Sequence, residues 1–144
     1  MSKVKDVMTK NVVTVEPEDR ALDAAVKMKE KGIGALIVTS KGYPVGILTE
    51  RDLVRKVIAT RKDPKSTRVV DVMSKPIVTT TPNATVKEAA KKMLINDVRR
   101  LPVVTHGKLV GIITAADLAK NLAGQLTGHD AILYAVARYH KYGY

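Results

Sequence analysis

The stretch Val4–Pro17, VKDVMTKNVVTVEP, returns at Val69–Pro82 as VVDVMSKPIVTTTP. Two later stretches return at the same spacing: ALDAAVKM from Ala21 matches VKEAAKKM from Val86, and PVGILTERDL matches LVGIITAADL. A repeat of fixed period decides the architecture, because each copy is expected to adopt the same supersecondary structure. Two units of roughly 50 residues would each be marginally stable alone. We therefore expect a fused, pseudo-symmetric pair.

The composition is that of a globular protein. Of the 144 residues, 45% are apolar, which argues against disorder. The chain has no cysteine, and its first residues, MSKVKDVMTK, lack the apolar segment of a secretory signal. No apolar run approaches the length of about 18 residues that a membrane span needs. We therefore expect a cytoplasmic protein without a membrane partner.

The formal net charge of +11 suits an anionic partner, such as nucleotide phosphates, nucleic acid or an acidic protein surface. Part of the charge gathers between Arg51 and Arg68, where a solvated linker is the simpler interpretation. Four of the five tyrosines lie at or after position 134. The repeats lack Phe and Trp, which usually stack on single strands. Nucleic-acid binding is therefore the main alternative rather than the first interpretation.

Each repeat reads as strand, helix, strand, strand, helix. The first copy has a β-branched run at Val12–Val15 and an apolar helical stripe from Ala21 to Met28. Two short strands at 35–39 and 45–49 follow, and the short turn between them predicts an antiparallel hairpin. A second helix is predicted from about Thr49 to Ala59.

Helix starts and the end of the chain carry further signals. Thr85 and Glu88 form a capping box at the first helix of the second copy, whereas Asp19 is the expected cap in the first copy. After the second repeat the chain departs from the pattern, and a C-terminal helix is predicted. The expected division is a first repeat, a basic linker, a second repeat and a helical extension (1–60, 61–68, 69–124 and 125–144).

The sharpest local signal is the pattern G-h-h-T-x-x-D, in which h is apolar, at Gly46–Asp52 and again at Gly111–Asp117. Thr-x-x-Asp at a helix start is a variant of the capping box, which explains one copy without any ligand. The same helix start offers free N–H groups and a positive dipole end that suit phosphate. The Thr hydroxyl and the Asp carboxylate suit the hydroxyls of a ribose. The two interpretations are compatible.

The ordered set DVM, V-T-x-x-P, A-A-x-x-M, LPVV and G-h-h-T-x-x-D-L resembles the CBS domain, and its repetition over about residues 4–120 resembles a tandem CBS pair, or Bateman module. The first copy departs from the family at Ile37, where Pro is common. The resemblance implies a mixed α/β fold of two β-α-β-β-α repeats, packed sheet to sheet about a pseudo-two-fold axis. It also implies two clefts between the halves that bind AMP, ADP, ATP, S-adenosylmethionine or, in some members, NAD, with Mg²⁺ only beside a polyphosphate and no covalent cofactor.

Carried over by motif, each implied cleft combines a Thr–Asp pair, for ribose and phosphate, with an apolar adenine wall from the other repeat. The residues implied for one cleft are Thr49, Asp52, Ile77, Val78 and Pro102. The residues implied for the other cleft are Thr114, Asp117, Val12, Val13 and Ile37.

Basic side chains distinguish the two copies. Arg99 and Arg100 stand where the family often places phosphate-binding residues, and the first copy has Gly34 and Ala35 at these positions. A guanidinium binds phosphate through a planar fork, so we expect unequal clefts. Arg51 is a further phosphate candidate, although a solvated charge at a helix start is the simpler explanation.

Catalysis is not expected, because no His cluster has metal-ligand spacing and no Ser stands in a nucleophile motif. The repeated Met8 and Met73 are explained by core packing. The sequence predicts a non-enzymatic regulatory module that binds an adenosine-containing ligand and signals to a separate effector protein. Apolar positions on the second helices (Leu53, Val57 and Leu122) predict a homodimer. The alternative is a module for nucleic acid or protein interaction that uses the basic surface and the Tyr-rich end.

Overall fold

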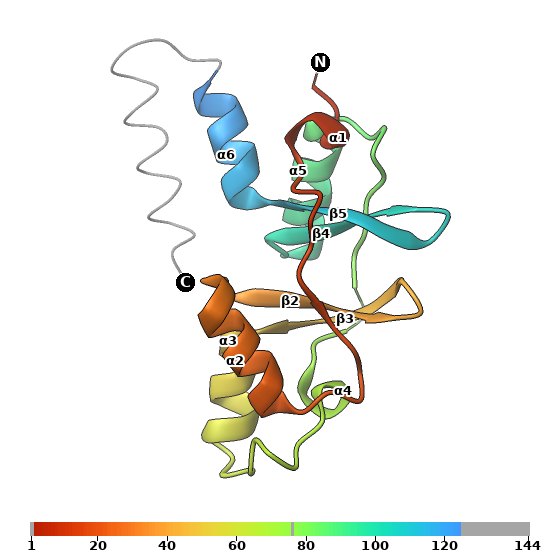
Figure 1. Ribbon diagram of the computed structural model, residues 1–144. Helices are drawn as coiled ribbons and strands as arrows, with labels where there is room; N and C mark the ends of the chain where they lie inside the picture. The colour runs from red at the N-terminus through yellow and green to blue at the C-terminus, as the bar shows by residue number, and fades with distance from the viewer. Residues whose placement is uncertain (1, 76, 125–144) are drawn as a thin grey trace. The chain divides into compact units, whose positions relative to one another are not determined.

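The computed structural model describes residues 2–75 and 77–124, which form a mixed α/β fold (Figure 1). The chain divides into two compact units. Among the described residues, one unit holds 2–10, Val78–Thr105 and 110–124, and the other holds 11–75, Ile77 and His106–Leu109. The predicted fold class is confirmed, whereas the helix expected within 125–144 lies outside the described residues.

The sheet of the first repeat has three strands. β1 (Thr14–Val15) pairs in parallel with β2 (Ala35–Ser40), and β2 pairs antiparallel with β3 (Tyr43–Thr49). Lys41 and Gly42 connect β2 to β3 with φ angles of 54° and 86°. Two consecutive residues with positive φ produce the tight turn whose twist matches that of a hairpin. The predicted hairpin is thus confirmed.

The first helix of this repeat, α2 (Ala21–Lys31), is capped by the linker rather than by its own side chains. The Ala21 and Leu22 amides donate to the backbone oxygens of Thr67 and Pro64, at 2.7 and 3.0 Å. The expected cap, Asp19, is therefore wrong; its carboxylate accepts from the Glu16 amide in the preceding turn. The linker carbonyls thus accept from helix-start amides that a side-chain cap usually satisfies. Because the linker is far from α2 in the sequence, the local sequence pattern could not reveal this cap.

The second helix of the first repeat is interrupted in its hydrogen bonding. It begins as α3 (Glu50–Leu53) and continues as a π-helical turn, η1 (Val54–Ile58), close to the bounds predicted from the sequence. The expectation that Leu53 and Val57 form an exposed face is wrong, because Val57 is only 2% exposed and Leu53 packs against the same core. The apolar stripe of this helix packs within its own repeat, and its exposed large apolar side chains are Val54 and Ile58.

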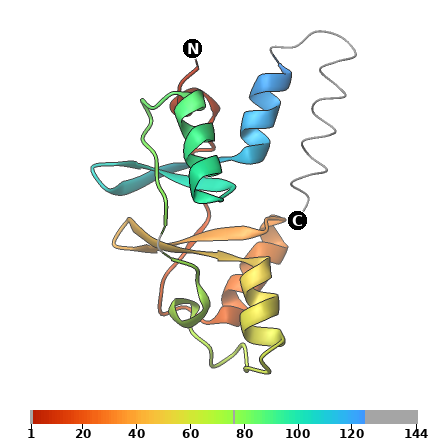
Figure 2. The same cartoon turned by 180° about the vertical axis from the view of Figure 1, so that it is seen from behind.

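The second repeat keeps the same plan with fewer strands. Among the described residues, β4 (Arg100–Thr105) and β5 (Lys108–Thr114) form the sheet, and an isolated parallel bridge between Thr80 and Val103 takes the place of the first strand. α5 (Val86–Asn96) and α6 (Ala115–Ala123) lie on one face of this hairpin (Figure 2). Unlike the corresponding helix of the first repeat, which changes from α3 to the π-helical η1, α6 is a regular α-helix throughout its length.

The cap of α5 is half of the predicted capping box. The Thr85 hydroxyl accepts from the Glu88 amide at 3.1 Å. Among the described residues, the Thr85 amide donates no return bond to the Glu88 carboxylate. The helix nevertheless starts where the sequence predicts, since one side-chain bond already satisfies an otherwise free amide.

Two helical turns were not expected from the sequence: α1 (Val4–Val7) and α4 (Val69–Val72), which contain the two DVM motifs. Val69 and Val72 belong to the core of the first repeat, whereas Val4 belongs to the core of the second. The start of each sequence repeat therefore completes the core of the other one. This exchange explains why the compact units do not coincide with the sequence repeats.

The DVM methionines and the motif glycines contact one another. Met73 packs against the first core and Met8 against the second, which confirms the core packing predicted for both. A Cβ on Gly46 would lie 2.5 Å from the Met73 sulfur, and one on Gly111 would lie 2.6 Å from the Met8 sulfur. The glycine of G-h-h-T-x-x-D is thus needed so that the methionine can pack on the strand.

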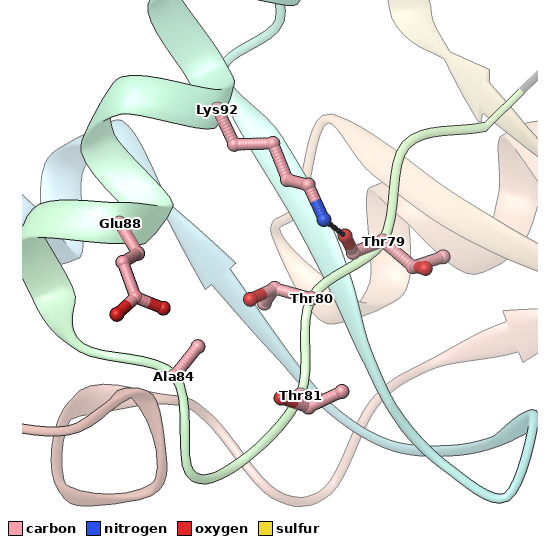
Figure 3. Close-up of a pocket in the computed structure, with 6 residues that line it drawn as sticks. All are labelled: Thr79, Thr80, Thr81, Ala84, Glu88 and Lys92. Carbon is pink, nitrogen blue, oxygen red and sulfur yellow. Dashed lines mark hydrogen bonds between the residues drawn. The ribbon is translucent and has the colours of Figure 1, made fainter.

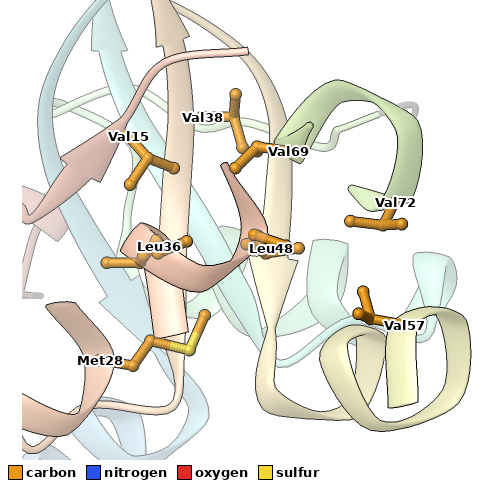
Figure 4. Close-up of a cluster of buried hydrophobic side chains, with 10 residues drawn as sticks. Val15, Met28, Leu36, Val38, Leu48, Val57, Val69 and Val72 are labelled. Atoms are coloured by element: carbon orange, nitrogen blue, oxygen red, sulfur yellow. The ribbon is translucent and has the colours of Figure 1, made fainter. Parts of the chain in front are cut away.

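The core of the first repeat shows how the pattern of the sequence becomes packing (Figure 4). Leu36 and Val38 alternate along β2, and Leu48 faces them from β3. Met28 from α2 and Val57 from η1 close the layer from the helix side. The period-two spacing in the strands directs one face of the sheet toward the helices.

Candidate functional site

The candidate site is built on two helix starts with the same local geometry. At the start of α3 the Thr49 hydroxyl accepts from the Asp52 amide at 3.1 Å, while the Asp52 carboxylate accepts from the Thr49 amide at 3.0 Å. At the start of α6 the corresponding bonds between Thr114 and Asp117 measure 3.1 and 2.9 Å. Both motifs are therefore reciprocal capping boxes, as the simpler interpretation of the sequence predicts.

The Asp52 carboxylate has further partners within its own unit. Its Oδ1 accepts from the Ser74 hydroxyl at 2.9 Å and lies 2.9 Å from the Lys56 Nζ. Lys56 also donates to the Val72 carbonyl at 3.2 Å. The Thr49 hydroxyl adds a contact of 3.1 Å to Oδ2. Asp52 is only 6% exposed, so it joins the helix start to the segment after α4.

Burial by itself raises the pKa of the Asp52 carboxyl, because a charge is less well solvated inside the protein. The hydrogen bonds from Lys56, the Thr49 amide and Ser74, together with the positive charge of Lys56, outweigh burial and hold that pKa below its ordinary value. Asp52 is thus ionised at neutral pH with its charge already compensated.

Lys56 and Ser74 were missed by the sequence reasoning. Lys56 follows Asp52 by four residues, and on a helix side chains at this spacing are neighbours. That signal was available in the sequence. No local signal placed Ser74 there, because it comes from a segment 22 residues further along the chain.

Asp117 has a different environment. In the described part of the chain, its carboxylate accepts only from the Thr114 amide, through Oδ2. Every buried side-chain nitrogen or oxygen of the described residues has a hydrogen-bond partner. Within the described residues, no hydrogen bond reaches the second oxygen of the half-buried Asp117. Of the two aspartates, Asp117 thus has fewer acceptor positions taken by the described residues.

The backbone before each hairpin meets the helix start of the same repeat. The Ala115 amide donates to the Arg99 carbonyl at 2.8 Å, and the Glu50 amide donates to the Gly34 carbonyl at 3.0 Å. Arg99 is thus placed beside the helix start that carries Asp117. At the other helix start, a Cβ on Gly34 would lie 2.6 Å from a Glu50 carboxylate oxygen.

The remaining predicted residues are spread over both units. The proposed adenine walls are mostly shielded from solvent: Ile37 and Pro102 are buried, and the others are half-buried (Val12, Val13, Ile77 and Val78). Arg51 and Arg99 are exposed, and Arg100, at the start of β4, is half-buried. Each implied cleft draws its residues from both units, so the two clefts stay predictions.

A polar pocket of about 250 Å³ lies within the second repeat, between α5 and the segment before it (Figure 3). Its lining residues are Thr79, Thr80, Thr81, Ala84, Glu88 and Lys92. Lys92 Nζ donates to the Thr79 carbonyl at 2.6 Å across its rim. The pocket shares no residue with the set predicted from the sequence.

Two kinds of structural feature are absent from the described part of the chain. No group of three or more His, Cys, Asp or Glu side chains there is arranged to hold a metal ion. No helix among those residues is both long and apolar enough to cross a membrane.

Comparison with known proteins gives consistent results. A family model described as CBS domain matches the chain twice, at residues 4–59 and 69–124. The chain is 40% identical over 121 residues to the CBS domain-containing protein YhcV of Bacillus subtilis, and the aligned region spans 84% of this chain and 86% of that protein. It is 44% identical over 117 residues to an uncharacterized protein of Methanopyrus kandleri; these span 80% of this chain but only 60% of the longer relative.

Solved structures show the same likeness. The CBS domain pair of protein MJ0100, in complex with 5′-methylthioadenosine and S-adenosyl-L-methionine, matches with a TM-score of 0.78 and 26% identity over 88% of this chain and 99% of that chain. A hexameric CBS-CP12 protein from bloom-forming cyanobacteria matches with a TM-score of 0.72 and 38% identity over 81% of this chain and 69% of that chain.

Proposed function

Since this chain belongs to the CBS domain family, as a tandem pair, we propose that it is a non-enzymatic regulatory module that binds an adenosine-containing ligand. The candidates are AMP, ADP, ATP and S-adenosylmethionine. The observation that carries the proposal is the repeated Thr–Asp helix start, where the Asp117 carboxylate accepts one hydrogen bond from the described residues and Asp52 accepts several. The ligands in the MJ0100 structure, both of which contain adenosine, support this class.

In the proposed mechanism the ligand acts by linkage. A ribose diol donates to the aspartate, and phosphate or another anionic group meets the positive end of the helix and Arg99. Bound ligand favours one arrangement of the two repeats, and a separate effector protein that binds this arrangement better gains affinity. Where the ligand is a polyphosphate, Mg²⁺ accompanies it.

We also propose that the module is a homodimer. Exposed apolar side chains on the second helices support this assembly: Val54 and Ile58 on η1 and Leu122 on α6. Monomeric proteins seldom leave contiguous apolar patches uncovered. The mass measured by sedimentation equilibrium is expected to be that of two chains, and a single-chain mass across the micromolar range would contradict the assembly.

The test of the proposed function is calorimetric titration of the whole chain with AMP, ADP, ATP, S-adenosylmethionine and adenosine, at low and physiological salt. At least one compound is expected to bind at both salt concentrations, because the sugar contacts do not depend on ionic strength. A chain that binds none of them, and instead binds RNA with an affinity that falls steeply with salt, would favour the nucleic-acid alternative. GTP is the matched control for adenine selectivity.

A further inference from the structure

We infer that Lys56 and Ser74 close the ribose-binding position at Asp52, so that one chain binds one adenosine ligand tightly, at Asp117. The inference rests on the proposed function and adds to it which helix start is used and which residues decide this. It makes Lys56 a specificity-determining residue that acts through Asp52 rather than by contact with the ligand.

The first step is the number of acceptor positions. A carboxylate has two oxygens with about four lone-pair positions in total. Four groups already occupy those of Asp52: the Thr49 amide and hydroxyl at Oδ2, and the Ser74 hydroxyl and Lys56 ammonium at Oδ1. A ribose diol can bind there only after it displaces one of these groups from a nearly buried carboxylate.

In the other copy of the repeat, the positions that correspond to Lys56 and Ser74 hold neither lysine nor serine. By the repeat spacing, Asn121 stands where Lys56 stands, and Thr9 where Ser74 stands. Thr9 forms the same bridge to β5, at Ile112, that Ser74 forms to β3, at Ile47. The backbone framework is therefore shared by the two copies, yet among the described residues the Asp117 carboxylate accepts only from the Thr114 amide, whereas the Asp52 carboxylate also binds Lys56 and Ser74.

The third step is charge. The Glu50 carboxylate lies against Gly34 at the start of α3, where a phosphate would approach the helix. At the start of α6 the corresponding residues are Ala115 and Arg99, which replace a negative charge with a positive one. Like charges disfavour an anionic ligand at the first position, and a guanidinium favours it at the second. Both the sugar and the anion therefore select Asp117.

The test measures how many adenosine molecules bind to the wild-type chain and to a Lys56→Met variant. Adenosine is the probe because it has no phosphate, so the loss of the lysine charge does not itself weaken binding. We expect about one site per chain in the wild type and a second, weaker site in Lys56→Met. The double variant Lys56→Met with Ser74→Ala is expected to strengthen the second site further, because it frees both positions at Oδ1.

The reciprocal variant, Asn121→Lys, keeps the first repeat unchanged. It places an ammonium four residues after Asp117 and is expected to weaken adenosine binding at least tenfold. Lys62→Met is the control for charge, since Lys62 is an exposed lysine of the linker, and it should keep one site and the wild-type affinity. Carbon-detected NMR of the Asp52 carboxyl gives a readout independent of ligand: its pKa should rise in Lys56→Met, because a cation that favours the ionised form has been removed.

The outcomes separate the two levels of the argument. A wild-type chain that binds adenosine at two sites of equal affinity, or a Lys56→Met chain that stays at one site, would overturn this inference and leave the proposed function standing. Failure of Asn121→Lys to weaken binding would also overturn it. If no chain in the series binds any adenosine compound, the proposed function fails and this inference fails with it.

Discussion

Replacing Leu36 with alanine is expected to destabilise the protein by about 3 kcal/mol, within the range of about 2–5 kcal/mol found for buried leucines. The Leu36 side chain is fully buried among residues from β3 and α2. Its truncation removes apolar surface from the core and leaves a cavity that a strand at the centre of the sheet cannot collapse to fill. Urea unfolding followed by circular dichroism measures the loss as a lower transition midpoint with an unchanged slope.

The matched control is Leu94→Ala, the same substitution at a side chain that is 80% exposed on α5. Its effect should stay within about 0.5 kcal/mol, since a surface change away from caps and partners has little influence on stability. If Leu36→Ala lowered the free energy of unfolding no more than Leu94→Ala, the described packing of β2 against α2 would be contradicted.

Most of the fold could be predicted because each helix or strand assigned in one copy of the repeat is supported by the matching stretch of the other copy. Local signals were sufficient for several elements. Turn chemistry predicted the hairpins, helical spacing predicted α2 and α5, and a cap at Thr85 predicted where α5 starts. Family membership followed from the order of the motifs rather than from any one of them. What local reasoning could not supply are contacts between distant segments. The linker oxygens that cap α2 and the exchange of Val4 and Val69 between the cores are such contacts.

In the candidate site, too, the features encoded locally were predicted and the contacts between distant segments were not. Thr49, Asp52, Thr114 and Asp117 were predicted as capping pairs, and their geometry follows from helix starts that the sequence encodes locally. The contrast between the two aspartates was not predicted, because it depends on Ser74 reaching Asp52 from a segment after α4. Arg99 and Arg100 were recognised as an asymmetry between the copies, but the helix start beside Arg99 emerges only from the backbone bond to Ala115.

Asp117→Asn is expected to lower the affinity for an adenosine ligand by about 10- to 100-fold. A hydrogen bond to a charged group contributes about 1.5–3 kcal/mol, and each 1.4 kcal/mol is about tenfold in affinity. Asparagine has nearly the same shape, and its carbonyl oxygen can still accept from the Thr114 amide, so the helix cap is retained. Titration with the best ligand of the panel, alongside urea unfolding of the same variant, separates lost binding from lost structure.

Asp52→Asn is the matched variant in the other repeat, and the comparison decides how the chain uses its two helix starts. Because the Asp52 carboxylate is already bonded to Lys56 and Ser74, its replacement should cost more stability than Asp117→Asn and less ligand affinity. Equal losses of affinity for the two variants would mean that both aspartates bind ligand. A larger loss for Asp52→Asn would assign the ligand to the buried carboxylate, against its complete set of hydrogen bonds.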